Sequence, residues 1–410
     1  MVYINDIFHS TSIIAHYFRK VKGLKELKMK ICAIICEYNP LHNGHVHQIR
    51  ESKRLTGADA VLCIMSGNFV QRGENAVLDK FSRAKHAIQA GADAVIELPT
   101  LFATSNAELF AKGGVKIATA IPSVTHLCFG AEHADKEQFI QTAKLMNDEP
   151  SEISSAIKDG LSKGLSYAKA RAEAYAAYQA AALLSSPNDI LGVEYTRAVL
   201  ESQSKIEILP IERIGAGYKE QTVHAFPSAS AIRTALFNDT LDKFINGIPE
   251  FVYTALNAAT DHEKTLEMLE KHALIAKPAS EIKQVLDCTE GLENALKKAA
   301  QNNLSIVESL TSARYTSSRI RRIMLQNLLE IKKTDIQTAL QTDLYLQVLA
   351  VKKDSGILSA LAESNYPLLI RAHDDTSLCE KAKRVKYVDD YAQSLYNILT
   401  GKKPKKEIFV

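Results

Sequence analysis

The sequence predicts an α/β protein in which a parallel sheet is covered by helices on both faces and is followed by a mostly α-helical region. Short apolar runs of strand length, such as Ile31–Cys36 and Ala60–Met65, are continuous rather than alternating, which is typical of strands buried on both faces. Segments with helical spacing separate these runs, as the crossovers between parallel strands require. Ligands of such sheets bind beyond the carboxyl ends of the strands, where we therefore expect the functional site.

The elements follow one another in a regular order. We expect strands at residues 31–36, 60–65, 94–98, 124–129 and 206–211, and helices at 44–55, 80–90, 107–118 and from 228 to 236. Residues 135–183 read as helical, and from 250 to 400 helical patterns dominate with little strand signal. We predict a Rossmann-like domain over residues 29–245 and an α-helical domain over 246–410. Residues 1–28, which precede a second methionine at Met29, are expected to be a non-essential N-terminal extension.

Composition sets the broad class. With 46% apolar and 24% charged residues among 410, the chain resembles an ordinary globular protein, and no apolar run reaches the roughly 18–20 residues that span a bilayer. A formal net charge of +3 indicates no whole-surface attraction to nucleic acid, although it is compatible with a local basic face. The six cysteines form no CxxC pair and no disulfide framework, and four lie in the apolar runs. We therefore expect a reducing compartment and a cytoplasmic protein.

The densest functional signal is the turn between the first strand and the first helix, which contains His42-Asn43-Gly44-His45. Pro40 disfavours a helical conformation at the residue before it, so the chain should stay extended past the strand. Asn43 is expected to cap the helix, and Gly44 should let a ligand approach the backbone. A helix N-terminus offers amides and a partial positive charge to phosphate, and the two imidazoles could donate hydrogen bonds to its oxygens.

Three other interpretations fit parts of this turn. Asn-Gly is also a hairpin signal, but its flanks are one strand and one helix. Cys36, His42, His45 and His47 could ligate zinc, but no second ligand pair lies at a usual spacing. Single histidines at a helix start are often caps or surface residues. A pair around Asn-Gly, directly after a buried strand, favours phosphate chemistry over all three.

The H-x-G-H pattern after the first strand resembles the nucleotidylyltransferase superfamily, which includes the class I aminoacyl-tRNA synthetases. This resemblance implies that His42 and His45 bind the ATP phosphates and stabilise the transition state of attack on the α-phosphate. A second segment, Ser228-Ala229-Ser230-Ala231-Ile232-Arg233, is similar to a phosphate signature of that superfamily. It departs from the pattern at Ala229, which leaves Ser228, Ser230 and Arg233 as candidate phosphate ligands. A capping role would give a similar pattern.

Further motifs occur in order and narrow the resemblance. They are Glu37-Tyr38-Asn39-Pro40, Met65–Glu74, Phe129-Gly130-Ala131-Glu132 and Ser186–Gly192, with Thr311–Ile320 in the helical region. Together, from about Met29 onwards, they resemble the tRNA(Met) cytidine acetate ligase family. The resemblance implies that acetate and ATP give acetyl-adenylate, and that the acetyl group passes to the wobble cytidine of elongator tRNA(Met) to form N4-acetylcytidine. Mg²⁺ would accompany ATP by neutralising its phosphates, without protein ligands that the sequence can name.

The resemblance and the predicted strand ends also give a set of binding candidates. Gly130 could hold adenine or ribose against the backbone or be a turn glycine, Asn188 could contact the nucleotide or cap a helix, and Arg213 could reach the phosphates or form a surface ion pair. The full ATP-binding set is Ile35, Cys36, Glu37, Tyr38, Asn39, Pro40, Leu41, Asn43, Gly44, Val46, His47, Gln48, Gly130, Asn188 and Arg213.

Two further polar segments are candidates for substrate contact. Asn68, Gln71 and Arg72 follow the second strand and could contact acetate, pyrophosphate or cytosine, or form a polar surface loop. Arg314, Arg319, Arg321 and Arg322 alternate with hydroxyl side chains, which suits RNA phosphates but also a solvated helix face.

Two other functions remain open from the residues themselves. One is a nucleotidylyltransferase acting on a phosphorylated small metabolite, for which a large helical domain with an arginine-rich segment would have no evident use. The other is a non-catalytic RNA-binding protein, against which the intact His42-Asn43-Gly44-His45 turn argues.

Overall fold

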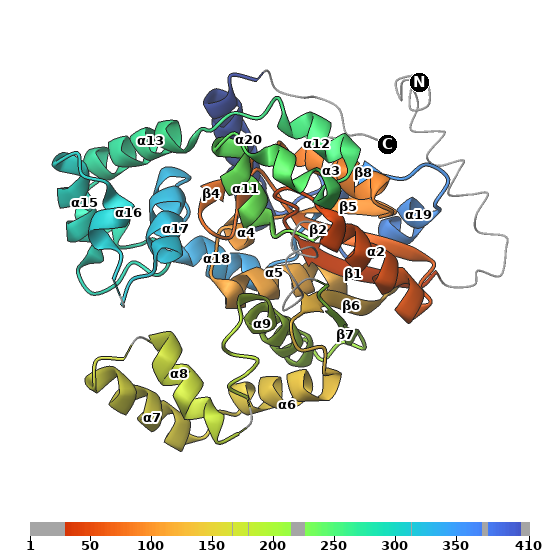
Figure 1. Ribbon diagram of the computed structural model, residues 1–410, viewed down its shortest axis with the longest axis horizontal. Coiled ribbons are helices and arrows are strands. Elements are labelled where there is room, and N and C mark those ends of the chain that lie inside the picture. The colour runs from red at the N-terminus through yellow and green to blue at the C-terminus, as the bar shows by residue number, and fades with distance from the viewer. Residues whose placement is uncertain are drawn as a thin grey trace.

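The computed structural model describes residues 29–402 except for residues 166, 179, 215–225, 313 and 371–375 (Figure 1). The predicted extension, residues 1–28, and the segment Gly215-Ala216-Gly217, which follows the strand expected at 206–211, lie outside the described residues. No described helix is both long and apolar enough to cross a membrane.

A seven-stranded sheet with the order β7-β6-β1-β2-β5-β8-β9 forms the centre of the molecule. Its first five strands pair in parallel, whereas β8 runs antiparallel to β5. The predicted fold class is confirmed. The strands are β1 (Ile31–Cys36), β2 (Ala60–Ser66), β5 (Ala94–Leu98), β6 (Val124–Ala131), β7 (Glu207–Glu212), β8 (Leu346–Val351) and β9 (Leu368–Leu369). A separate antiparallel hairpin consists of β3 (Phe69–Val70) and β4 (Glu74–Asn75).

The strand order places the site. From β1 the chain proceeds to β2 and β5 on one side, and then crosses back to β6 and β7 on the other side. The strand order therefore reverses between β1 and β6. In parallel α/β sheets, the crevice beyond the carboxyl ends of the strands at such a switch point is the usual ligand site. The turn that follows β1 and the end of β6 both lie there.

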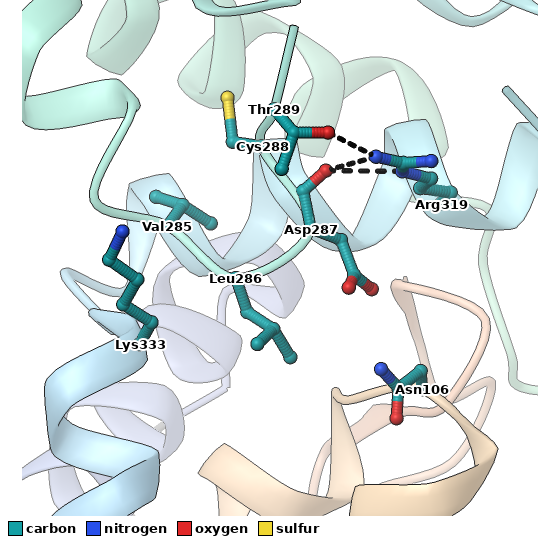
Figure 2. A pocket seen from close by; sticks show the side chains of 8 residues that line it. All are labelled: Asn106, Val285, Leu286, Asp287, Cys288, Thr289, Arg319 and Lys333. Atoms are coloured by element: carbon teal, nitrogen blue, oxygen red, sulfur yellow. Dashed lines mark hydrogen bonds between the residues drawn. The ribbon is translucent and has the colours of Figure 1, made fainter.

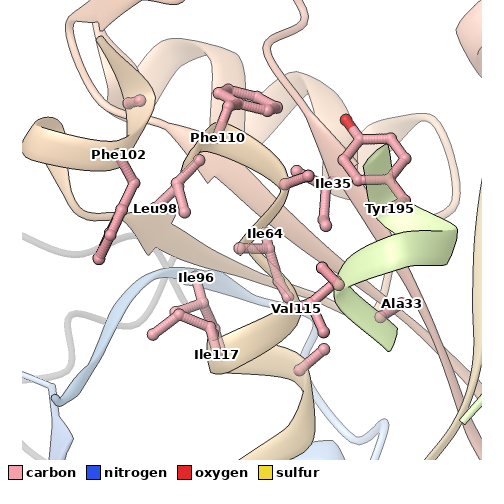
Figure 3. Close-up of a cluster of buried hydrophobic side chains, with 14 of the residues drawn as sticks. Ala33, Ile35, Ile64, Ile96, Leu98, Phe102, Phe110, Val115, Ile117 and Tyr195 are labelled. Atoms are coloured by element: carbon pink, nitrogen blue, oxygen red, sulfur yellow. The ribbon is translucent and has the colours of Figure 1, made fainter. Parts of the chain in front are cut away.

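Helices cover both faces of the sheet, which is why the strand sequences are continuously apolar. On one face, Ile35, Ile64 and Ile96 pack against Phe110 and Val115 of α5 (Figure 3). The other face is covered by α2, α3, α11 and α12 (Glu250–Leu256). The helices of the sheet region are α2 (Asn43–Thr56), α3 (Lys80–Gln89), α4 (Thr100–Ala103), α5 (Ala107–Thr119), α6 (Lys136–Asn147), α7 (Ser151–Ser162), α8 (Tyr167–Ala176), α9 (Pro187–Glu201), α11 (Ala229–Phe237) and the 3₁₀ helix η2 (Leu241–Gly247).

The later part of the chain is mostly helical and has its own small core. Leu274, Leu296 and Ile323 belong to a hydrophobic cluster built by α13 to α17, which lie together at one side of the molecule (Figure 1). The helices are α12 (Glu250–Leu256), α13 (Glu263–Ala276), α14 (Ala279–Ile282), α15 (Leu292–Gln301), α16 (Ile306–Leu310), α17 (Ser317–Leu328), α18 (Lys333–Leu340), α19 (Ile357–Ala362) and α20 (Glu380–Thr400).

The C-terminal part then returns to the sheet. β8 and β9 extend the sheet beyond β5, and α20 contributes Val385, Val388 and Leu395 to the core of the first face. Neither strand was predicted, and both lie inside the predicted helical domain of residues 246–410. The division at residue 245 stays a prediction.

Candidate active site

The turn after β1 is capped by a histidine pair. His42 is the N-cap of α2, and its Nδ1 accepts a hydrogen bond from the amide of Gly44 at 3.1 Å. In return, Nδ1 of His45 accepts from the amide of His42 at 3.3 Å. The prediction that Asn43 caps this helix is wrong; the Asn43 side chain instead donates to the carbonyl of Asn246 at 2.8 Å.

The capping pattern fixes where each imidazole carries its proton. A neutral imidazole has one donor and one acceptor nitrogen, and both Nδ1 atoms here accept from backbone amides. The proton of each ring is therefore on Nε2. The rings stack with centroids 3.7 Å apart and planes 26° from parallel, so they form a fixed pair of Nε2–H donors.

Burial keeps both rings neutral. His42 is 4% exposed, and burial, assisted by the charge of Arg213, lowers its pKa from 6.5 to about 3. Burial lowers the pKa of His45 well below its ordinary value, and the charges of His42 and Arg213 act in the same direction. At neutral pH the pair thus offers two uncharged donors, beside one guanidinium, to a ligand that brings negative charge.

The amides at the start of α2 are less available than expected. The Gly44 amide is taken by His42 Nδ1, and the His45 and Val46 amides both donate to the carbonyl of His42. The expectation that unpaired amides are offered to a phosphate is therefore wrong for Gly44, His45 and Val46. Gly44 also has a second reason to be glycine, because a Cβ there would lie 2.9 Å from Cε1 of the His42 ring. The two imidazoles remain as donors of this turn, and Arg213 adds a positive charge from the end of β7.

Three side chains, those of Glu132, Asn188 and Arg213, meet at the ends of β6 and β7. Nε of Arg213 lies 3.5 Å from Oε1 of Glu132, and Nδ2 of Asn188 donates to the same oxygen at 2.6 Å. A Cβ on Gly130 would lie 3.4 Å from Cγ of Arg213, so this glycine leaves room for the arginine to cross the strand end. Ser186, not Asn188, caps α9. The structure therefore brings Gly130, Asn188 and Arg213 together, with Glu132 as a partner that the sequence analysis did not select.

Arg83, on α3, is the main residue that the sequence analysis missed. Its side chain is 1% exposed and donates to the carbonyls of Glu37 at 2.6 Å, Ser66 at 3.1 Å and Leu78 at 3.0 Å, and also to that of Gly67. One guanidinium thus ties the end of β1 to the end of β2. No local pattern marks an arginine whose acceptors come from distant turns.

The segment before the histidines is held from both sides. Oε1 of Glu37 accepts from the Gln71 amide at 2.7 Å, and Oδ1 of Asn39 accepts from the Val77 amide at 2.9 Å. Nη1 of Arg233 donates to the Asn39 carbonyl at 2.8 Å. Nδ2 of Asn39 is buried and makes no hydrogen bond with any residue that the structure describes. One buried donor of this turn is therefore left for another partner.

The other members of the predicted ATP-binding set lie in the same turn. Ile35, Cys36, Tyr38, Pro40 and Leu41 are buried, and Val46, His47 and Gln48 are half-buried in the first turns of α2. The ring of Tyr38 lies 4.9 Å from that of His45. The zinc interpretation finds no support, because no three His, Cys, Asp or Glu side chains among the described residues are grouped to hold a metal ion.

Comparisons with known proteins agree with this geometry. A family model described as HIGH Nucleotidyl Transferase matches residues 29–408. The tRNA(Met) cytidine acetate ligase of Acetivibrio thermocellus is 36% identical over 394 residues, which cover 90% of this chain and 94% of that protein. The chain belongs to this ligase family. The ligase of Caldanaerobacter subterraneus is 39% identical over 317 residues, covering 74% of this chain and 79% of that protein.

A solved member of the family has the same fold. The crystal structure of Thermotoga maritima TmcAL bound with alpha-thio ATP aligns with a TM-score of 0.79 and 28% identity, covering 92% of this chain and 95% of that one. The family resemblance predicted from the ordered motifs is confirmed.

Several residues that the family resemblance suggested as ligands make contacts within the protein. Ser228 caps α11 by accepting from the Ala231 amide, and Arg233 contacts Ser230 at 3.5 Å and Glu74 at 3.6 Å.

The candidates that follow the second strand are also held within the protein. Asn68 is buried, and its side-chain oxygen accepts from the Lys80 amide while its side-chain nitrogen donates to Gln393. Arg72 alone of the β3–β4 turn is exposed, and its charge reaches Glu37 and Arg233.

The arginine segment of this ligase-family chain is also anchored. Arg319 donates to the carbonyl of Asp287 and to Thr289, and Arg321 pairs with Glu263 at 2.6 Å. Arg322 lies 3.8 Å from Asp287, and Arg314 pairs with Glu290. The prediction that these four residues contact RNA stays a prediction.

Proposed function

We propose that this chain is an ATP-dependent ligase that activates acetate as acetyl-adenylate and transfers the acetyl group to the wobble cytidine of elongator tRNA(Met). The observation that carries the proposal is the stacked pair of neutral histidines at the switch point of the sheet. Each Nδ1 accepts from a backbone amide, so each ring keeps its Nε2–H group as a donor, and the charge of Arg213 acts on both rings. The curated relatives are tRNA(Met) cytidine acetate ligases, and the related crystal structure holds an ATP analogue.

The first step is a substitution at the α-phosphate. A carboxylate oxygen of acetate forms a bond to phosphorus, and the bond from phosphorus to pyrophosphate breaks. No protein group need act as nucleophile, so the protein contributes positioning and charge stabilisation. The Nε2–H groups of His42 and His45 would donate to phosphate oxygens, whose negative charge grows in the transition state. Arg213 supplies the fixed positive charge.

The second step moves the acetyl group. The exocyclic amine of cytidine attacks the acyl carbon, the bond to the AMP oxygen breaks, and the amine loses one proton. An aromatic amine is a weak nucleophile, so the acyl-adenylate must be held close to it and away from water. The buried floor made by Arg83 and the ends of β1 and β2 holds the turn that carries the histidines.

Magnesium neutralises the phosphates of ATP and would arrive with the nucleotide. No three His, Cys, Asp or Glu side chains among the described residues are grouped to hold a metal ion.

Nucleoside analysis tests the proposal. The protein is incubated with ATP, radiolabelled acetate and bulk tRNA, and the tRNA is digested to nucleosides. Label in N4-acetylcytidine, dependent on ATP, is the expected result. Label in no nucleoside, together with nucleotidyl transfer to a phosphorylated metabolite, would replace this proposal with the alternative transferase.

A further inference from the structure

A cleft of about 530 Å³ lies between the start of α5 and the segment that joins α14 to α15 (Figure 2). Its walls include the aliphatic side chains of Val285 and Leu286, and its polar lining includes Asn106, Asp287 and Lys333. None of these residues belongs to the histidine turn or to the Arg213 cluster. The size is within the range of roughly 300–1,000 Å³ that is usual for sites of small-molecule size.

The cleft is close to the active site but separated from it by the β3–β4 hairpin. The carboxylate of Asp287 lies 3.8 Å from Arg322, and Arg322 contacts the carbonyl of Gln71 at 3.5 Å. The amide of Gln71 in turn donates to Glu37, just before the histidine turn. A Cβ on Gly73 would lie 2.5 Å from the backbone nitrogen of Arg322, so the hairpin packs directly on α17. The β3–β4 hairpin therefore lies between a ligand in this cleft and the turn that carries His42 and His45.

The polar groups of the cleft suit a nucleotide. Lys333 is exposed, and no carboxylate among the described residues lies within ion-pair distance of its ammonium group. Burial and the charge of Glu293 raise the pKa of the Cys288 thiol, and the charges of Arg319, Lys283 and Lys333 act against them. Three cations and one carboxylate therefore lie around the floor of the cleft. Asn106 and the Asp287 carboxylate stand on opposite sides of the opening (Figure 2). A carboxylate accepts from exocyclic amino groups of bases, and lysine binds phosphate.

We propose that this cleft holds an unstacked nucleotide of the tRNA other than the cytidine that is acetylated. Its base packs on the adjacent side chains of Val285 and Leu286, and its phosphate contacts Lys333. Its edge faces the Asp287 carboxylate and Nδ2 of Asn106, whose Oδ1 accepts from the Leu109 amide. Sequence-specific proteins commonly recognise single-stranded RNA by such splayed bases. The inference rests on the proposed function, since it supplies the RNA, and it adds a subsite at which the substrate is recognised.

The test compares two exposed lysines in the first turns of helices. Lys333→Glu reverses the charge at the cleft, and Lys264→Glu makes the same change on α13, outside the cleft. A glutamate is favourable in the first turn of a helix, so neither variant should unfold. We expect Lys333→Glu to raise the KM for tRNA by about tenfold, the scale of losing one phosphate contact, while Lys264→Glu leaves it near the wild-type value. Acetate-dependent pyrophosphate exchange without tRNA should be unchanged in both.

Photocross-linking locates the contact directly. A tRNA containing 4-thiouridine is irradiated with the full chain, and the cross-linked peptides are identified by mass spectrometry. Cross-links within residues 285–289 or at Lys333 are expected. Equal KM values for the two lysine variants with cross-links elsewhere would overturn the proposal, and so would a raised KM for ATP with an unchanged KM for tRNA, which would indicate a free nucleotide. If the wild-type chain acetylates no tRNA, the proposed function has failed instead.

Discussion

Replacing His42 with asparagine separates the two roles of this side chain. Asparagine is a good N-cap, and its Oδ1 takes the place of the imidazole Nδ1 that accepts from the Gly44 amide. Its Nδ2 corresponds to the Cδ2 position of the ring, so it stops short of the place that Nε2 occupies. The variant should therefore keep the helix start and lose the donor to the phosphate.

The expected magnitudes differ for the two roles. Losing the cap leaves the Gly44 amide without its acceptor, which costs about 0.5–2 kcal/mol of the free energy of unfolding. His42→Ala should suffer this cost, whereas His42→Asn, which keeps a capping oxygen, should lose less than about 0.5 kcal/mol. Removing one transition-state donor costs about 100- to 1,000-fold in rate, which corresponds to roughly 2.7–4 kcal/mol. Both variants should show that loss in adenylation.

Two measurements on the same preparations give the answer. Urea unfolding reports stability, and acetate-dependent exchange of labelled pyrophosphate into ATP reports adenylation. A His42→Asn protein that is stable and still exchanges at the wild-type rate would refute the donor role. A His42→Asn protein as unstable as His42→Ala would refute the capping argument.

Three further predictions follow from the same contacts. Burial holds the pKa of His42 at about 3 rather than 6.5, so below pH 6.5 the unfolded chain binds more protons than the folded one, and the free energy of unfolding decreases as the pH is lowered. In urea unfolding, the wild type should lose on the order of 2 kcal/mol relative to His42→Asn between about pH 6.5 and pH 5. The same pH dependence in both proteins would contradict this. Arg83→Met leaves four carbonyls without their donor and should lower the free energy of unfolding by at least about 3 kcal/mol, measured by urea unfolding, with Arg83→Lys recovering part of it. Gly130→Ala places a methyl group 3.4 Å from Cγ of Arg213, at the edge of ordinary van der Waals contact, and should change the KM for ATP by less than about tenfold with no loss of thermal stability; a larger change in either would contradict this packing.

The central strands could be predicted because burial on both faces leaves a direct mark in the sequence. β1, with its unbroken run from Ile31 to Cys36, is found where the run predicts it. β8 has a similar run, from Leu346 to Val351, yet it was missed. A short apolar run fits a buried helix as well as a strand, and the helical patterns on either side of residues 346–351 favour a helix there.

The contacts of the site could not be predicted, because they join residues that are far apart in the chain. Local preference ranks asparagine above histidine as a helix cap, but the pairing of His42 with His45 decides the helix start here. Arg83 lies on an ordinary helical segment, and only the fold shows that its acceptors belong to two strand ends and a turn. The motif order, in contrast, predicted the family correctly.

The isotope content of the released AMP tests the central claim most directly. Acetate labelled with ¹⁸O in both carboxylate oxygens is supplied with ATP and tRNA, and the products are analysed by mass spectrometry. Attack of acetate on the α-phosphate, followed by acetyl transfer to the amine, leaves one labelled oxygen in each AMP. AMP without the label, or label in inorganic phosphate, would contradict an acetyl-adenylate formed at the histidine pair.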